Sequence, residues 1–407
     1  MSKKRLLLYG INYHPELIGI GKYTGEMAAW MQRNGFDVRV VTAPPYYPDW
    51  RVSNEYHSCR YTREEIDGVG VWRCPLYVPR EPSGLKRLLH LFSFMLSSFP
   101  VMLRQVFWKP DIVMMIEPPF FCAPAALLTT RLAGARSWLH VQDLELDAAF
   151  NLGLLPNSLR PFAMALERFI LRRFDWLSTI SNRMQEMLAA KGISQDRITF
   201  FPNWVDIDRI YPLPAQASLR AELDIKQDAF VLLYSGNIGE KQGIGQIIAA
   251  ARHIQHQKDI VFMLCGTGAA YQRTRAHSRG LNNVRWLPLQ PLETFNALLN
   301  TADAHLLPER ADASGLVMPS KLLGMLASAI PIISTAKPGS QLAAIIQQAG
   351  LLVPQDDPQA FAAAIERLRT NEDLRRQLGA SGLAYCKHHF AKPVVLSRIR
   401  DRLLHII

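Results

Sequence analysis

The sequence predicts an α/β protein with two doubly wound parallel-sheet domains that face each other across a cleft. Its 407 residues exceed what one hydrophobic core usually organises. Short apolar runs alternate with helical patterns, and the alternation starts again after a proline-bearing segment at Asp206–Pro214. We expect an N-terminal domain at 1–205, a second domain at 206–385, and a C-terminal helix at 386–407 that packs back on the first domain.

The first domain is expected to begin with a strand at 6–11, followed by a helix that starts after a glycine-bearing turn and ends near Asn34. Further strands are predicted at 38–41, 112–116, 138–141 and 176–180, with helices at 123–133, 158–173 and 182–191. This alternation is typical of a parallel sheet that helices cover on both faces.

The second domain repeats the order, with a strand at 230–234, a glycine-rich turn and a helix at 246–255. Further strands are predicted at 260–265, 283–287, 303–307, 331–335 and 351–353. Ligands of open parallel sheets bind beyond the carboxyl ends of the strands. The cleft between two such edges is therefore the expected site.

Charge and cysteine content narrow the function classes. The net charge of +11 predicts an anionic partner, which nucleic acid, an anionic membrane surface or a phosphate-bearing substrate would satisfy. No nucleic-acid recognition module is evident, so we expect no nucleic-acid partner. The five cysteines show no Cys-x-x-Cys pair, which disfavours disulfides and structural zinc and favours the cytoplasm. The apolar run Leu6–Tyr9 is too short for a signal peptide.

Gly19 and Gly21 lie where the first strand gives way to the first helix. Backbone N–H groups and the helix dipole there can hold a phosphate or sugar oxygens, although a tight turn would use the same glycines. A dinucleotide fingerprint fits less well, because Thr24 takes the third glycine position and no acidic residue ends the second strand. We expect no NAD and no other cofactor.

A turn with three glycines at 235–243 opens the second domain. Its three glycines, the first of which is Gly236 followed by Asn237, would let the backbone approach a diphosphate whose charge Lys241 offsets. The spacing is not that of a Walker A loop. Gly266 repeats the pattern after the next strand, although sterics alone could require it there.

A helix start precedes the strand at 331–335. Pro319 suits the first helical turn, and the N–H groups of Ser320 and Lys321 would be open to a nucleotide phosphate or ribose. Asp312 lies shortly before. A helix start of this kind is common, so a purely structural role is an equal alternative.

His140, Asp143 and Glu145 follow one another at the end of the strand at 138–141. Three such residues in a loop are usually solvated or cap a helix, and we expect no metal site.

An uncharged run of 13 residues at 91–103 lies between Lys86 and Arg104. It is shorter than the roughly 20 residues that span a bilayer. Cations and Trp108 at its ends suit a helix in the headgroup layer. A buried core helix is the alternative, and Pro100 predicts a kink or break.

Five segments in this order resemble the glycosyltransferases of family four, which are retaining enzymes of the GT-B fold. The segments are Asn12–Glu16 with Gly19–Thr24, Ile180–Asn182 with Phe201–Asp206, Tyr234–Gly243, Asp303–Pro308, and Pro319–Lys321 with Pro331. The resemblance covers nearly the whole chain and is strongest to colanic acid fucosyltransferases. It implies transfer of L-fucose from GDP-fucose, a nucleotide-sugar donor, to a lipid-linked saccharide acceptor at the inner face of the cell membrane.

The resemblance also implies roles for single residues. Gly21 would approach the donor phosphate or sugar, and Lys241 would neutralise the diphosphate, with Asn237 where many relatives have arginine. His140 and Asp143 would lie on the acceptor side, where Asp143 orients or deprotonates the hydroxyl.

Two acidic positions of the family are altered in this chain. Asp312 falls near the first, and Gly324 occupies the second, which grips the ribose in relatives. The helix start at Pro319–Lys321 is then expected to hold the nucleotide instead. An inactive scaffold subunit would also explain Gly324, and a sugar-nucleotide epimerase on the same fold is a further alternative that needs acid/base carboxylates in the cleft.

Overall fold

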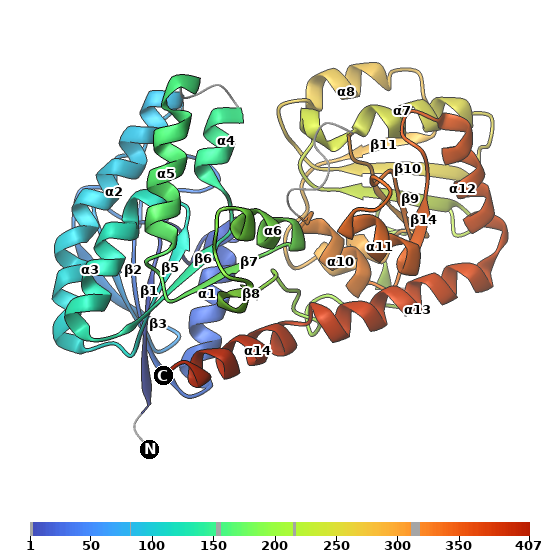
Figure 1. Cartoon of the computed structure of the whole chain (residues 1–407). Helices are drawn as coiled ribbons and strands as arrows, with labels where there is room; N and C mark the ends of the chain where they lie inside the picture. The colour runs from blue at the N-terminus through green and yellow to red at the C-terminus, as the bar shows by residue number, and fades with distance from the viewer. Residues whose placement is uncertain (1–2, 82, 152–155, 215–216, 311–317) are drawn as a thin grey trace. The chain divides into compact units, whose positions relative to one another are not determined.

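The computed structural model describes residues 3–81, 83–151, 156–214, 217–310 and 318–407, with the backbone alone at 148, 149, 151 and 241 (Figure 1). The chain forms two compact units. Met1–Pro202 and Leu396–Ile407 make up the first, and Asn203–Val395 makes up the second.

The first unit is built on an eight-stranded sheet with the order β3-β4-β2-β1-β5-β6-β7-β8. Neighbouring strands are parallel except at one edge, where β3 is antiparallel to β4. The strands are β1 (Lys4–Tyr9), β2 (Phe36–Thr42), β3 (Thr62–Ile66), β4 (Val69–Arg73), β5 (Ile112–Glu117), β6 (Arg136–Val141), β7 (Trp176–Thr179) and β8 (Ile198–Phe200).

The helices of the first unit cover both faces of this sheet. They are α1 (Gly19–Arg33), α2 (Gly84–Gln105), α3 (Ala123–Ala133), α4 (Glu145–Asn151), α5 (Arg160–Leu171) and α6 (Asn182–Ala190). Leu7 and Val113 of the sheet share one core cluster with Phe94 of α2, Ala126 of α3 and Leu171 of α5. These three helices therefore lie on the same face. The crossover from β1 to β2 runs the opposite way along the sheet, so a right-handed connection places α1 on the other face.

Helix α2 is continuous over 22 residues, with Pro100 inside it. The expected break at Pro100 is absent. Buried residues at 90, 94, 98, 102 and 105 form one stripe against the sheet on both sides of the proline, and these contacts hold the helix together. With the turn that follows it, Gly84–Trp108 is the one helix among the described residues long and apolar enough to cross a membrane, judged by length and composition alone.

The second unit contains a six-stranded, fully parallel sheet with the order β11-β10-β9-β12-β13-β14. The strands are β9 (Phe230–Ser235), β10 (Ile260–Cys265), β11 (Val284–Leu287), β12 (Ala304–Leu307), β13 (Ile332–Ser334) and β14 (Gly350–Leu352). The helices are α7 (Ile244–His253), α8 (Tyr271–His277), α9 (Phe295–Leu299), α10 (Lys321–Ala327), α11 (Gln341–Ala349), α12 (Pro358–Thr370) and α13 (Glu372–His389).

The last helix, α14 (Lys392–His405), begins in the second unit and ends in the first. Leu396, Ile399 and Leu403 are buried along one side of it. Within the first unit, Arg400 lies over the ring of Trp30 in α1, 5.9 Å from its centroid. The chain thus passes between the two units twice.

The prediction of two parallel-sheet α/β domains is confirmed. The antiparallel edge pair β3–β4 was not predicted. The residues of β3 are largely polar and exposed, and β4 is a short strand of five residues that buries only every second one.

Candidate functional site

Glu16 is buried at the carboxyl edge of the first sheet, between β1 and α1. Its Oε1 accepts hydrogen bonds from the backbone N–H groups of Tyr46 and Tyr47 at 3.1 Å each, and its Oε2 accepts one from Asn12 Nδ2 at 3.0 Å. Burial raises the pKa of the Glu16 carboxyl, and these donors oppose the rise. A Cβ at Gly21 would lie 2.3 Å from Glu16 Oε2, so Gly21 makes room for this side chain.

Gly19 is the first residue of α1, and a Cβ there would face the ring of Tyr47 at 3.4 Å. The expected approach of Gly19 and Gly21 to a phosphate stays a prediction. The packing of Glu16 against α1 already accounts for the glycine at 21.

His140 is buried at the end of β6, with 3% of its surface exposed. Its Nδ1 lies 2.9 Å from Ser178 Oγ, its Nε2 lies 3.1 Å from Gln142 Nε2, and its ring packs on Phe201 with centroids 4.5 Å apart. Burial lowers the pKa of His140 to about 3, so the ring is neutral near pH 7. Any role toward an acceptor would therefore use hydrogen bonding by a neutral ring.

Two carboxyl groups at the same sheet edge have raised pKa values. Glu145 begins α4, and its Oε2 accepts the N–H of Phe120 at 2.7 Å. Burial raises the pKa of Glu145 to about 7, with the charge of Asp143 adding to the rise. Glu117 ends β5, and burial followed by the charge of Glu145 raises its pKa well above the usual range. Its buried Oε2 has no hydrogen-bond partner within the described part of the chain.

Glu145 therefore gives this edge a carboxyl group that titrates near neutrality and can give up or accept a proton. Asp143 is exposed.

Lys191, at the end of α6, forms ion pairs near this edge. It pairs with Asp147 of α4 at 2.6 Å and with Glu167 of α5. This largely buried network joins α4, α5 and α6.

At the carboxyl edge of the second sheet, the loops after β9 and β10 pack backbone against backbone. The Gly236 N–H donates to the Cys265 carbonyl at 3.0 Å, and the Ile238 N–H donates to the Thr267 carbonyl at 2.9 Å. Gly266 has a φ of 151°, and a Cβ there would lie 1.9 Å from Gly236 O. Only glycine fits at 266, so the glycine pattern has a steric cause in the fold.

Lys321 lies across this edge, at the start of α10. Its Nζ donates to the Tyr234 hydroxyl at 2.7 Å and lies 4.2 Å from the ring centroid. The Tyr234 hydroxyl donates in turn to the Asn237 carbonyl at 2.5 Å. A Cβ at Gly236 would lie 3.4 Å from Lys321 Nζ. Burial lowers the pKa of Lys321 to about 8, partly offset by Glu309, whose own pKa is raised by burial.

The structure brings Gly236, Asn237, Gly266 and Lys321 together in this way. Lys241 lies in the short 3-10 helix η6 (Glu240–Gln242), and its side chain is outside the described residues. Ser320 is exposed just before α10 and makes no side-chain cap. Asp312 lies outside the described residues.

Three residues at these edges were not found from the sequence. Glu117 follows an apolar strand and precedes two prolines, which was a usable signal. Tyr234 and Glu309 gave none, because each matters through Lys321, which is distant in sequence. No group of three metal-ligand side chains occurs among the described residues, and all five cysteines are free.

Two family models match the chain. A glycosyl transferase 4-like domain matches residues 19–204, and a glycosyl transferases group 1 domain matches residues 215–384. The Escherichia coli (strain K12) protein WcaI, named as a colanic acid biosynthesis glycosyl transferase, is 42% identical over 374 residues, which are 90% of this chain and 91% of WcaI. The chain belongs to this glycosyltransferase family.

Solved structures agree on the fold of this glycosyltransferase. Sucrose-phosphate synthase from Thermosynechococcus elongatus matches with a TM-score of 0.74 over 99% of both chains at 17% identity. Anabaena HepE in complex with UDP and glucose matches with a TM-score of 0.70 over 99% of this chain and 100% of HepE at 12% identity. At these identities the likeness shows the fold, which is the expected GT-B fold.

Both candidate edges of the glycosyltransferase lie inside the matched regions. The edge with Glu117 and Glu145 belongs to the glycosyl transferase 4-like domain, and the edge with Lys321 belongs to the group 1 domain. As a glycosyltransferase, the protein uses a nucleotide-sugar donor and a saccharide acceptor.

Proposed function

We propose that this glycosyltransferase moves L-fucose from GDP-fucose to a lipid-linked saccharide during assembly of a colanic acid type of exopolysaccharide. The identity of 42% to WcaI, with its colanic acid name, supports the pathway. The observation that supports binding of the donor is the position of the Lys321 ammonium at the carboxyl end of β9. It lies 3.4 Å from where a Cβ on Gly236 would be.

The donor diphosphate lies against the backbone of the turn at 236–243 in this proposal. Lys321 and Lys241 offset its charge, and Gly266 keeps the neighbouring loop close behind. The partly buried Lys321 gains from an arriving anion, because opposite charge favours the protonated form that desolvation disfavours. Cations placed before the reaction stabilise the departing diphosphate, typically by several kcal/mol (~3) for one donor.

The reaction forms a bond from the acceptor hydroxyl oxygen to the anomeric carbon of the donor. The bond from that carbon to the diphosphate oxygen breaks, and the nucleoside diphosphate leaves with the electron pair. The hydroxyl proton passes to a carboxylate at the first edge, where Asp143 is exposed and Glu145 has a pKa of about 7. The proposal includes retention of anomeric configuration, on the family resemblance.

We place the enzyme at the cytoplasmic face of the inner membrane, attached without crossing it. Helix α2 supports attachment, because it buries polar groups on the sheet that a spanning helix would expose to lipid. Ser98 Oγ lies 2.6 Å from the Tyr9 hydroxyl, and His90 Nδ1 lies 2.6 Å from the Tyr77 carbonyl oxygen. Replacing Lys86, Arg87 and Arg104 by glutamate should release the protein from anionic vesicles without lowering its melting temperature.

An inactive scaffold is the second candidate, favoured by Gly324. A Cβ at this position would lie 3.3 Å from Leu299 Cδ1, so Gly324 allows α10 to pack on α9. The scaffold hypothesis predicts donor binding without turnover. An epimerase would instead convert the donor with no acceptor present.

A thermal-shift screen of nucleotide sugars tests the donor. A ligand at 100 times its dissociation constant adds about 2.7 kcal/mol of stability. GDP-fucose should give the largest shift, and Lys241→Ala should reduce it more than Lys241→Arg. Incubation with lipid-linked acceptor should then release GDP. A shift with another nucleotide alone would reject GDP-fucose, and a shift without GDP release would favour the scaffold.

A further inference from the structure

The outer side of the helical layer on the first sheet is unusually apolar. More than half of the large hydrophobic side chains exposed within the described residues belong to α2, α3, α5 and the short turns beside them. On α2 and its following turn they are Leu85, Leu88, Leu89, Phe92, Leu96, Phe99 and Phe107; near α3 they are Phe121, Leu128 and Leu132; near α5 they are Leu159, Phe162, Leu166 and Phe169. Soluble surfaces seldom gather so many in one layer.

The spacing shows that these are outward stripes of helices already packed on the sheet. On α5, exposed side chains at 162, 166 and 169 follow the helical period, while Leu171 is buried in the core. Phe162 is 71% exposed. Helix α2 packs against α3, and successive right-handed crossovers from β5 to β7 place α3 and α5 in one layer.

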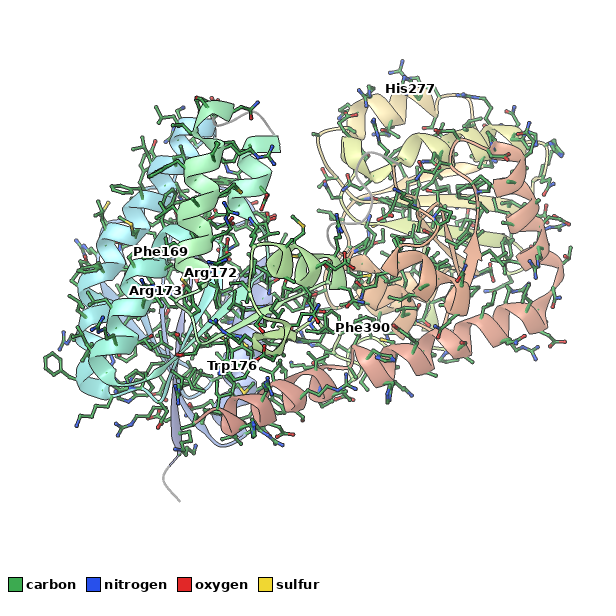
Figure 2. All side chains as sticks on the ribbon, viewed as in Figure 1. Phe169, Arg172, Arg173, Trp176, His277 and Phe390 are labelled. Atoms are coloured by element: carbon green, nitrogen blue, oxygen red, sulfur yellow. The ribbon has the colours of Figure 1, made fainter. Side chains whose placement is uncertain are left out.

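The exposed charges of α2, α3 and α5 have one sign. Helices α2 and α3 contain no acidic residue, and the single acid of α5, Glu167, is buried and paired with Lys191. Exposed cations are frequent, and they are Lys86, Arg87, Arg104, Arg131, Arg160, Arg168, Arg172 and Arg173. Figure 2 labels Phe169, Arg172 and Arg173 at the carboxyl end of α5, where the Arg173 guanidinium lies 4.5 Å from the Phe169 ring centroid.

A pocket of about 780 Å³ lies at the carboxyl end of α2. Inside it, the Arg39 guanidinium sits 4.9 Å from the Trp72 ring centroid and 4.3 Å from that of Trp108. Arg63 lies 4.8 Å from the Trp72 centroid. Arg104 of α2 also lines the pocket, and no acidic side chain does within the described part of the chain. Arginines held on tryptophan faces are preorganised for phosphate, which they bind through two N–H groups.

We propose that the exposed faces of α2, α3 and α5, with the Arg39 pocket, form one docking surface for an anionic lipid bilayer. The apolar stripes enter the acyl boundary, the cations around them contact headgroups, and the pocket takes a lipid phosphate. This rests on the proposed peripheral attachment and extends it from one helix to a surface on three. Helix α2 alone is about 33 Å long at 1.5 Å per residue, so the surface is broad enough to fix orientation.

The exposed positive charge of this surface favours an anionic bilayer over a second copy of the chain as its occupant. A second copy of this chain would bring the same cations face to face, which is repulsive. A bilayer rich in acidic lipid satisfies both the apolar stripes and the exposed cations, and each cation near such a surface contributes to binding.

Vesicle sedimentation with the full chain tests the surface. Wild type should sediment at low salt with vesicles containing phosphatidylglycerol and much less with pure phosphatidylcholine. Phe162→Glu with Phe169→Glu should weaken binding at least about tenfold, since two buried aromatic rings are lost from the acyl boundary. The matched control is Leu289→Glu with Leu292→Glu, which adds the same charge at exposed leucines of the second unit and should bind as wild type.

The pocket has its own pair of variants. Arg39→Gln with Arg63→Gln should reduce binding to phosphatidylglycerol vesicles more than Arg275→Gln with Arg279→Gln, which removes equal charge from exposed sites in the second unit. Melting temperature and the GDP thermal shift are measured on every variant. A variant that keeps the GDP thermal shift but loses vesicle binding supports the docking surface. If wild type shows no GDP thermal shift, the donor proposal is rejected and the vesicle result is unaffected.

Two results would overturn the surface. One is wild-type protein that stays in solution with every vesicle. The other is an α5 variant that binds like wild type. A dimer by light scattering that the α5 variant dissociates would mean that a second copy covers the surface instead.

Discussion

At the residue scale, the charge of Lys321 depends on its surroundings near physiological pH. It is partly buried against Tyr234, and its pKa of about 8 lies close to physiological pH. Lys321→Met should keep the volume and remove the charge. A charge-assisted contact worth about 1.5–3 kcal/mol corresponds to a roughly ten- to hundredfold weaker GDP dissociation constant, measured by calorimetry at pH 7.

Lys321→Arg is the matched control and should retain more affinity than the methionine variant. Wild-type affinity should also fall as the pH rises above about 8, because Lys321 then loses its proton. That decline should be absent from the methionine variant. Equal affinity of all three proteins would remove Lys321 from the donor site.

Glu145 makes a second prediction at this scale. Its pKa is about 7 in the folded chain against an ordinary value of 4.5. The folded state therefore binds the extra proton, so its stabilising effect is complete below pH 4.5 and is lost as the pH rises through 7. Glu145→Gln mimics the protonated form and should raise the melting temperature at pH 8, with little change at pH 4.5. The gain in the free energy of unfolding at pH 8 should be at most about 3 kcal/mol.

The same variant tests the proton transfer of the proposed reaction. If the ionised Glu145 accepts the acceptor proton, wild-type turnover should rise with pH through about 7. Glu145→Gln should lose that rise. An unchanged pH profile would leave Asp143 as the remaining carboxylate for the role.

Sequence reasoning at the residue scale singled out these loops but not the neighbours within them. Gly21 stands out as a helix-start glycine, yet its close contact is with Glu16, which no spacing rule pairs with it. His140 was expected to face an acceptor, and the structure surrounds it with Ser178 and Phe201. These partners meet only when separate strands align, so their effect on pKa is visible only in the fold.

At the element scale, α10 and α9 meet at Gly324. The family resemblance places an acidic residue that grips the ribose at position 324, and Gly324→Glu would restore it. The Cβ position, however, faces Leu299 at 3.3 Å and the Phe295 ring at 3.9 Å. Gly324→Glu should therefore lower the free energy of unfolding by about 1–3 kcal/mol through overpacking.

Denaturant unfolding measures that loss, and Gly324→Ala is the control with a smaller expected cost. A glutamate variant as stable as wild type and with altered nucleotide affinity would contradict the packing explanation. It would also revive the ribose contact.

Strands buried at every position were predictable, and the exposed edge strand β3 was not. β5 and β10 are buried at every position and read as apolar runs. β3 shows no such run, because it lies at the sheet edge with largely exposed residues. Helix α2 is longer than the apolar run at 91–103 because it includes polar residues at both ends. Packing of its middle on the sheet keeps it continuous, and composition does not reveal that packing.

At the scale of the whole molecule, the path of α14 is the feature to test. Leu403 is fully buried within the first unit although it follows the entire second unit in sequence. Leu403→Ala should destabilise the first unit by about 2–5 kcal/mol. Differential scanning calorimetry should show the transition of one unit move to lower temperature.

The exposed Leu404→Ala is the matched neighbour and should have little effect. If Leu403→Ala leaves every transition in place, then α14 contributes nothing to the first unit. The two-domain organisation itself followed from the repeated alternation of strands and helices. The residue boundaries of each unit depend on which surface the last helix covers. Tertiary packing determines that surface, so the boundaries are not visible in the sequence.

The return of α14 also sets an order of events during synthesis on the ribosome. Residues up to Pro202 emerge first, but the segment Leu396–Ile407 that completes their unit emerges only after the whole second unit. Until then the nascent first unit exposes the apolar surface that Leu396, Ile399 and Leu403 later cover. Such a half-finished unit is a natural client for chaperones, and a chain stalled before residue 396 should aggregate through that surface.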